Sequence, residues 1–246
     1  MKTSTISIIK KALIILFWLI IWQLLATFIN KPLIFASFTD CLYRFSQLLI
    51  DKTFYLSLLT TLSETLLGLF IAFVLAILLS YFCYKHILFQ EIINPLIAVL
   101  KSVPVVSIAI MLLIWQGNKF LSFFVSFSVV FPNVYYSLLV SFNNTDKHLL
   151  DACNIYKLSN KEIFIHIHLF NIRNVLIAIT QSSISMAFKS TIASEVISLA
   201  SNSMGLQLYY CKLNLDTAGL FCYTFTLILL SHLTETILMK ILERQS

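Results

Sequence analysis

Residues 120–142, FLSFFVSFSVVFPNVYYSLLVSF, form a run without a charged side chain that is long enough to cross a lipid bilayer as a helix, which takes about 20 residues. The polar segment 146–172, DKHLLDACNIYKLSNKEIFIHIHLFNI, follows it, and a second, mostly apolar run occupies 175–199. A polar segment between two spans has to lie in water, because the bilayer core does not solvate its charges. These three segments therefore predict two membrane helices joined by a structured aqueous loop.

The rest of the chain has the same apolar character. Of its 246 residues, 59% are hydrophobic and 11% are charged, which excludes an ordinary soluble domain. The apolar runs lack the alternation of strands, so we expect an all-α integral membrane protein. Its remaining polar stretches are too short for a soluble catalytic domain. The six expected transmembrane helices lie at 10–29, 56–80, 93–114, 120–142, 175–199 and 218–240.

The distribution of basic residues predicts the orientation of these spans. Residues 1–29 lack a small-x-small cleavage site, so we interpret them as a retained first span and not as a signal peptide. With the N-terminus inside, ten of the 17 Lys and Arg residues lie in cytoplasmic segments, five lie in external segments and two lie within spans. This bias predicts cytoplasmic N- and C-termini and a cytoplasmic loop at 146–172. The net charge of +6 therefore reflects topology and does not indicate nucleic-acid binding.

The segment 146–172 has the pattern of a helix–turn–helix. Thr145 or Asp146 can cap a first helix that carries apolar residues on one side. After a break at Lys157–Leu158, Ser159 and Glu162 have the spacing of a capping box, which predicts a second helix from about Lys161 to Leu169. We expect both helices to lie across the membrane face. From the residues alone, an ordinary amphipathic loop packed on the spans remains equally open.

The same segment resembles the EAA loop of ABC-importer permeases. Asp151-Ala152-Cys153, then Ser159 and the apolar run 163–169, follow the family pattern of Glu-Ala-Ala, a turn and an apolar stretch. The resemblance extends from about Thr60 to Glu235 and is closest to the nitrate/sulfonate/taurine-type permeases of the binding-protein-dependent class. Further matching pieces occur in the family's order, at Lys101–Pro104, Trp115–Gly117, Phe131–Pro132, Ala187–Val196 and Met204–Leu206.

The segment also departs from the family pattern. Asp151 replaces Glu and is shorter by one methylene, and Cys153 replaces the second Ala. Lys157 stands where the family has a turn Gly, a change that costs about 1 kcal/mol if the position needs a positive φ. Phe170-Asn171 replaces the usual Pro. These changes predict either an altered loop geometry or an adapted partner.

The resemblance implies a permease subunit of the cell (inner) membrane. It implies that the chain binds no cofactor, and that ATP and Mg are bound by two cytoplasmic ABC ATPase subunits. The sequence indeed has no GxxxxGK[ST] motif. The other implied partners are a second copy of the chain, an external substrate-binding protein and membrane lipid. The substrate would be a small solute, such as a nitrate-, sulfonate- or taurine-like anion or a vitamin precursor.

The resemblance also implies the domains and the residues that contact the ATPase. Residues 1–55 would form an N-terminal span and external loop, 56–240 a permease core and 241–246 a cytoplasmic tail. Asp151 would pair with a basic ATPase side chain or cap the local helix, and these two roles remain open. The expected ATPase-coupling residues are Leu149, Leu150, Asp151, Ala152, Cys153, Tyr156, Lys157 and Ser159.

Charges within the spans predict the translocation path. Lys189 and Glu195 fall in the middle of 175–199, but six residues apart on a helix they do not share one face. Each therefore needs a partner from another helix or another copy, and we expect both to act as gate or ion-pair residues. The residues expected along the path are Lys189, Glu195, Ser185, Ser194 and Lys101. Alternatively, the hydroxyl residues serve only close helix packing, and Lys101 reaches the interface by snorkelling.

Two other classes of protein remain as alternatives. An ion-driven secondary transporter predicts inverted repeats and an acidic ion site, for which the sequence offers Glu195 and Glu64. A structural scaffold would leave the charges within the spans unexplained. The five Cys residues are scattered and read as apolar fillers, and the rings of His166 and His168 diverge on a helix, which argues against a metal pair.

Overall fold

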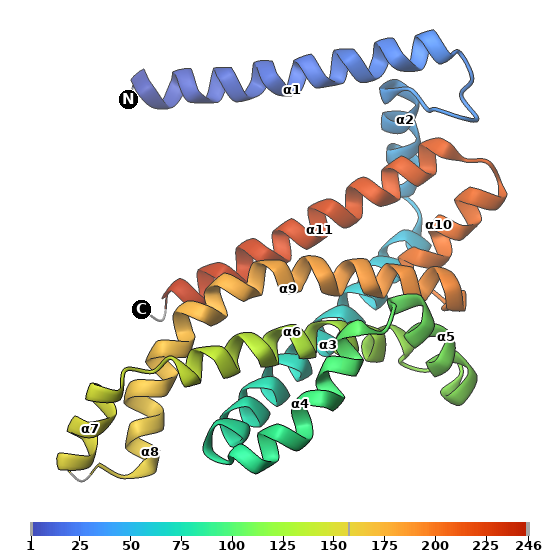
Figure 1. Cartoon of the computed structure of the whole chain (residues 1–246). Helices are drawn as coiled ribbons and strands as arrows, with labels where there is room; N and C mark the ends of the chain where they lie inside the picture. The colour runs from blue at the N-terminus through green and yellow to red at the C-terminus, as the bar shows by residue number, and fades with distance from the viewer. Residues whose placement is uncertain (1, 157, 245–246) are drawn as a thin grey trace.

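The computed structural model describes residues 2–156 and 158–244, and these residues form helices and their connections (Figure 1). The all-helical fold agrees with the prediction. The helices are α1 (Lys2–Ile29), α2 (Phe38–Leu48), α3 (Lys52–Lys85), α4 (Ile87–Ser102), α5 (Val105–Gln116), α6 (Leu121–Asn143), α7 (Lys147–Ile155), α8 (Asn160–Ile163), a π-helix (Phe164–His168), α9 (Leu169–Ser198), α10 (Met204–Leu213) and α11 (Thr217–Arg244).

Four of these helices are long and apolar enough to cross a membrane, namely α3, α6, α9 and α11. They coincide with four of the predicted spans, while the first predicted span lies within α1, whose apolar part is the shorter stretch Leu13–Ile29. The span predicted at 93–114 is not a single straight helix. That stretch divides into α4 and α5, which are bent by 100° relative to each other.

The bend between α4 and α5 has a local cause at Pro104. A proline disfavours the helical conformation of the residue before it and has no N–H for a helical bond. Val103 is accordingly extended, with φ −69° and ψ 130°, and Pro104 becomes the residue from which α5 starts. Pro95 and Pro132 lie inside α4 and α6 without ending them.

Three helices, α3, α6 and α9, form the centre of the protein. Small side chains on α3, Ala72 and Ala76, are fully buried against apolar residues of α6 and α9, such as Val134 and Ala187. At Gly68 a Cβ atom would lie 2.8 Å from the carbonyl oxygen of Phe123, so α3 and α6 approach each other closely. Small residues at the contact are typical of helices that pack inside a membrane.

The outer helices, α1 and α11, leave large apolar surfaces exposed. Only 11% of the most apolar window of α11 is buried. The indole of Trp22 attaches α1 to the rest, through its hydrogen bond to the Ala36 carbonyl (3.1 Å) and its contact with the Phe221 ring. Closer to the N-terminus, apolar side chains such as Trp18 (63% exposed) are only partly covered by the described residues. In a membrane, lipid or another subunit covers such surfaces.

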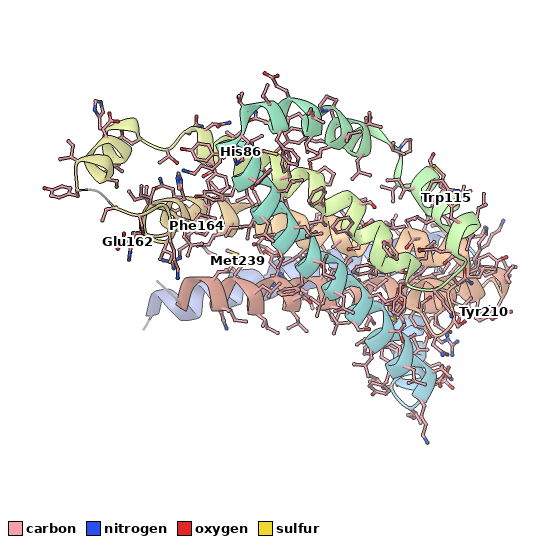
Figure 2. All side chains as sticks on the ribbon, turned by 90° about the horizontal axis from the view of Figure 1, so that it is seen from below. His86, Trp115, Glu162, Phe164, Tyr210 and Met239 are labelled. Carbon is pink, nitrogen blue, oxygen red and sulfur yellow. The ribbon has the colours of Figure 1, made fainter. Side chains whose placement is uncertain are left out.

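The two ends of the bundle differ in character. Both chain termini lie at the end where α7 and α8 project, whereas α2 and α10 lie at the other end (Figure 1). Figure 2 shows Glu162 and Phe164 far from Trp115 and Tyr210. At the end with α2 and α10, the guanidinium of Arg44 donates to the carboxylate of Asp216 over 2.8 Å and ties α2 to the start of α11.

Candidate functional site

The polar segment after α6 begins with a capped helix. The side chain of Asp146 accepts a hydrogen bond from the N–H of His148 over 2.9 Å, so Asp146, and not Thr145, caps α7. At the other end of α7, the N–H of Leu158 donates to the carbonyl of Cys153 over 3.0 Å. Neighbouring residues therefore satisfy one backbone group at each end of this short helix.

The next helix, α8, starts with the capping box of Ser159 and Glu162. The N–H of Ser159 donates to the Glu162 carboxylate over 2.7 Å, and the N–H of Glu162 donates to the Ser159 hydroxyl over 3.3 Å. These bonds lower the pKa of Glu162 below its ordinary value, because they stabilise the charged carboxylate. The box fixes where the second helical stretch begins.

The predicted end of this second helix at Leu169 is wrong. The chain passes from α8 through the π-helix Phe164–His168 into α9 without a break, and the N–H of Leu169 donates to the carbonyl of Phe164. The physical reason lies in Phe170-Asn171, which stands where the resembled family has Pro. Both residues keep their N–H groups, so nothing forces the helix to end before the membrane span.

The expected ATPase-coupling residues fall into three groups. Leu149 (49% exposed), Asp151, Tyr156 (80% exposed) and Ser159 lie on the surface. Cys153 is only 6% exposed and contacts this chain, so it does not belong to an accessible surface. Lys157 and the side chains of Leu150 and Ala152 lie outside the described part of the structure.

A groove between α9 and α11 contains two of the expected path residues. Lys189 and Ser185 line it from α9, and His232 and Glu235 line it from α11, around a volume of about 570 Å³. Nδ1 of His232 lies 3.9 Å from the carboxylate of Glu235. His232 was not among the expected residues, although its spacing of three from Glu235 places both on one face of a helix.

Glu195 lies away from this groove, fully buried between α3, α9 and α10. Its carboxylate accepts hydrogen bonds from the Thr61 hydroxyl (2.8 and 3.0 Å) and from the N–H of Gly205 (2.9 Å). The Thr61 hydroxyl in turn accepts the N–H of Met204 over 3.0 Å. The carboxylate thus accepts a hydrogen bond from a backbone N–H in the first turn of α10, where the helix dipole favours a negative charge. Thr61, 134 residues away, was not among the expected residues.

The five expected path residues therefore do not form one site. Ser194 is buried near Glu195, where its hydroxyl donates to the Thr191 carbonyl over 2.7 Å. Lys101 is exposed at the end of α4, and its ammonium lies 5.4 Å from the centroid of the Tyr136 ring. Only Lys189 and Ser185 share a groove. The role of each residue in translocation stays a prediction.

Gly205 is required by the close approach of α10 to α9. A Cβ atom at this position would lie 2.3 Å from the Cβ of Glu195 and 2.9 Å from the backbone nitrogen of Val196. We expect Gly205→Ala to destabilise the protein by about 1–3 kcal/mol, because the two helices must move apart. Thermal unfolding of detergent-solubilised protein, followed by size-exclusion chromatography, measures the effect.

The control for this prediction is Lys212→Ala, which shortens an exposed side chain of the same helix, α10. It should leave the unfolding midpoint close to that of the wild type. A midpoint for Gly205→Ala equal to that of the wild type would show that α9 and α10 are not in contact as described.

Comparison with known proteins identifies the family. None of the curated proteins compared with the chain matches it. Residues 65–245, which include most of α3 and all later helices, match the family model described as "Binding-protein-dependent transport system inner membrane component". This range contains the segment α7–α8, the α9–α11 groove and Glu195. The chain therefore belongs to the family of binding-protein-dependent transport system inner membrane components.

Proposed function

We propose that the chain is the permease subunit of an ATP-driven ABC importer, and that two copies form the pathway for a small solute delivered by an external binding protein. The observation that carries this proposal is the exposed, capped segment α7–α8 at one end of an apolar bundle that belongs to a transport family. Members of this family are transport subunits and are generally not enzymes. ATP and Mg²⁺ would be bound by the partner ATPases.

The segment α7–α8 suits a docking role because its ends are held. A short helix with satisfied termini moves as a rigid body, whereas an unstructured loop would absorb the displacement of a partner. Leu149 and Tyr156 offer exposed apolar area, and Asp151, two residues after Leu149 on α7, offers a negative charge. A groove on the ATPase with apolar walls and a basic side chain would complement this surface.

We place the α7–α8 end in the cytoplasm. Both termini lie at this end in Figure 1, and the excess of basic residues in the segments assigned to the same side supports the assignment. The substrate-binding protein would then meet the opposite end, where α2 and α10 are joined by Arg44 and Asp216.

The α9–α11 groove would supply half of the translocation path. A charge at the bilayer centre costs about 2.5–3.5 kcal/mol even on the most lenient scale, so Lys189 needs water or protein around it. The largely exposed face of α11 leaves room for a second copy to close the groove. The ammonium of Lys189 would suit an anionic solute, such as a nitrate-, sulfonate- or taurine-like anion. A vitamin precursor is the other substrate class that we propose.

Lys189→Met is expected to lower solute uptake about tenfold or more while the complex still assembles, because the loss of one charge–anion contact in a poorly solvated path costs at least 1.4 kcal/mol. Uptake into proteoliposomes, measured with the solute that copurifies with the binding protein, checks this. Lys10→Met, which removes an exposed lysine of α1, should leave uptake within a factor of about two. Equal uptake by both variants would remove Lys189 from the path.

The proposed function itself is tested by expressing the chain together with candidate ATPase and binding-protein subunits from the same genome. We expect the ATPase to copurify with the permease from membranes. We also expect proteoliposomes of the assembled complex to accumulate solute only when ATP is present on the ATPase side. Accumulation that follows an ion gradient without ATP would instead identify a secondary transporter.

A further inference from the structure

The side chain of His168 lies in an aromatic cage at the base of the α7–α8 segment. Its ring is fully buried, and it meets the rings of Tyr84, Phe142 and Tyr81 edge-on at centroid distances of 5.1, 5.6 and 5.8 Å. The ring of Phe164, at the other end of the π-helix, contacts Tyr81 at 4.5 Å. Figure 2 shows Phe164 at the end of the molecule that also carries His86, where α3 stops.

The cage joins the elements that border the α7–α8 segment. Tyr81 and Tyr84 belong to the last turn and a half of α3, Phe142 to the end of α6, and His168 is the last residue before α9. A displacement of α7 and α8 therefore reaches the membrane helices through the π-helix and its cage. A π-helix inserts an extra residue into the helical turn and occurs frequently at functional sites.

The nitrogens of His168 are poorly satisfied in this position. Nδ1 lies 3.4 Å from the hydroxyl of Thr145, near the limit of a hydrogen bond. Within residues 2–156 and 158–244, no hydrogen-bond partner lies near the buried Nε2. A phenylalanine would fill an aromatic cage without this penalty, so the histidine at this place calls for a functional reason.

The groups around His168 favour its neutral form. From α3 it faces Tyr81, Tyr84 and Lys85, whose ammonium lies 5.7 and 5.6 Å from the two tyrosine ring centroids. Phe142, at the end of α6, and the Thr145 hydroxyl, in the turn after α6, also face the ring. On the π-helix that contains His168, the other titratable group is the exposed His166. Burial and the Lys85 charge lower the pKa of His168 below its ordinary value of 6.5.

We propose that His168 is the positioning residue that transmits a displacement of α7–α8 to α3 and α6. Protonation of His168 opens the cage and so uncouples α7–α8 from these two membrane helices. The proposal rests on the proposed function for the source of the displacement. The neutral ring packs among the aromatic side chains, whereas an imidazolium would be buried beside Lys85 without a carboxylate among its described neighbours. The ligand that operates this switch is thus a proton, which would reach the His168 imidazole from the side of the membrane that bears α7–α8.

The direction of the pH dependence follows from the lowered pKa. Above the ordinary value of 6.5 the imidazole is neutral both in the closed cage and when released, so pH does not affect the cage. As the pH falls below that value, the released form binds a proton more readily than the caged form, and the cage loses stability. We therefore expect closure at about pH 7.5 and opening towards about pH 5.5.

The experiment measures the accessibility of Cys153, which is buried on α7, in the permease alone in lipid nanodiscs. Maleimide labelling of this thiol is followed by peptide-resolved mass spectrometry at both pH values. At pH 7.5, His168→Ala should label several-fold faster than the wild type, and His168→Phe should match the wild type because it refills the cage. At pH 5.5, the wild type should label several-fold faster than His168→Phe. The matched control, His166→Phe, changes an exposed histidine of the same π-helix and should behave as the wild type at both values.

Equal labelling of the wild type and His168→Phe at both pH values would overturn the proposal, and this comparison stands even where His168→Ala does not fold. Because no ATPase is present, that result would leave the copurification test of the proposed function unaffected. Conversely, failure of the ATPase to copurify would overturn the proposed function without changing the labelling rates.

Discussion

Glu195→Leu should abolish the accumulation of folded protein in the membrane. The substitution leaves the Thr61 hydroxyl and the Gly205 N–H buried without their acceptor, and each unpaired donor costs about 1–3 kcal/mol. It also removes the carboxyl group that lies at the start of α10, an end of the helix where the helix dipole favours a negative charge. Together these losses approach the whole stability of a domain of ordinary size. The yield of monodisperse protein on size-exclusion chromatography measures the effect.

One further variant restores part of the lost acceptor, and another serves as a control. Glu195→Gln keeps one carbonyl oxygen for the Thr61 hydroxyl or the Gly205 N–H, so we expect a lowered but measurable yield. Glu91→Leu removes an exposed carboxylate from α4 and should leave the yield unchanged. A normal yield of Glu195→Leu would contradict the network between α3, α9 and α10.

Asp151→Arg is expected to lower the retention of the ATPase on the permease about tenfold or more, which corresponds to at least 1.4 kcal/mol of binding free energy. The exposed carboxylate lies on α7, the helix that we propose for the contact, and a reversed charge there would repel a basic group of the partner. Copurification from membranes, with the ATPase quantified per permease, measures the effect.

The matched control for Asp151→Arg is Glu91→Arg, which reverses another exposed acidic residue near the same end of the molecule. We expect it to retain the ATPase. Equal retention by both variants would show that α7 does not carry the docking surface, and loss from both would indicate a general effect of the added positive charge.

The sequence predicts the long spans and the local caps well, because both depend on neighbouring residues. Charge-free runs of about 20 residues identify α3, α6 and α11 by hydropathy alone. The capping box of Ser159 and Glu162 lies within four residues, so its pattern is complete in the sequence. The same local reasoning explains why Pro104, beside an extended Val103, divides a run that hydropathy treats as one span.

The environment of the charged residues could not be predicted in this way. Glu195 finds its partners on α3 and α10, and Lys189 shares a groove with His232 and Glu235 of α11, so both depend on how distant helices pack. His168 was dismissed as half of a metal pair, yet its cage is built from residues 26 to 87 positions earlier in the chain. Helical spacing says which face a residue occupies but not which helix lies against it.

Photo-crosslinking from α7 tests the central claim most directly. A benzoylphenylalanine residue replaces Tyr156, which is 80% exposed, or Tyr43, which is exposed on α2 at the opposite end of the molecule. Irradiation of membranes that contain the ATPase should produce a permease–ATPase adduct from position 156 and none from position 43. An adduct from position 43 alone, or no adduct from position 156 in a complex that copurifies, would contradict the assignment of α7–α8 as the docking segment.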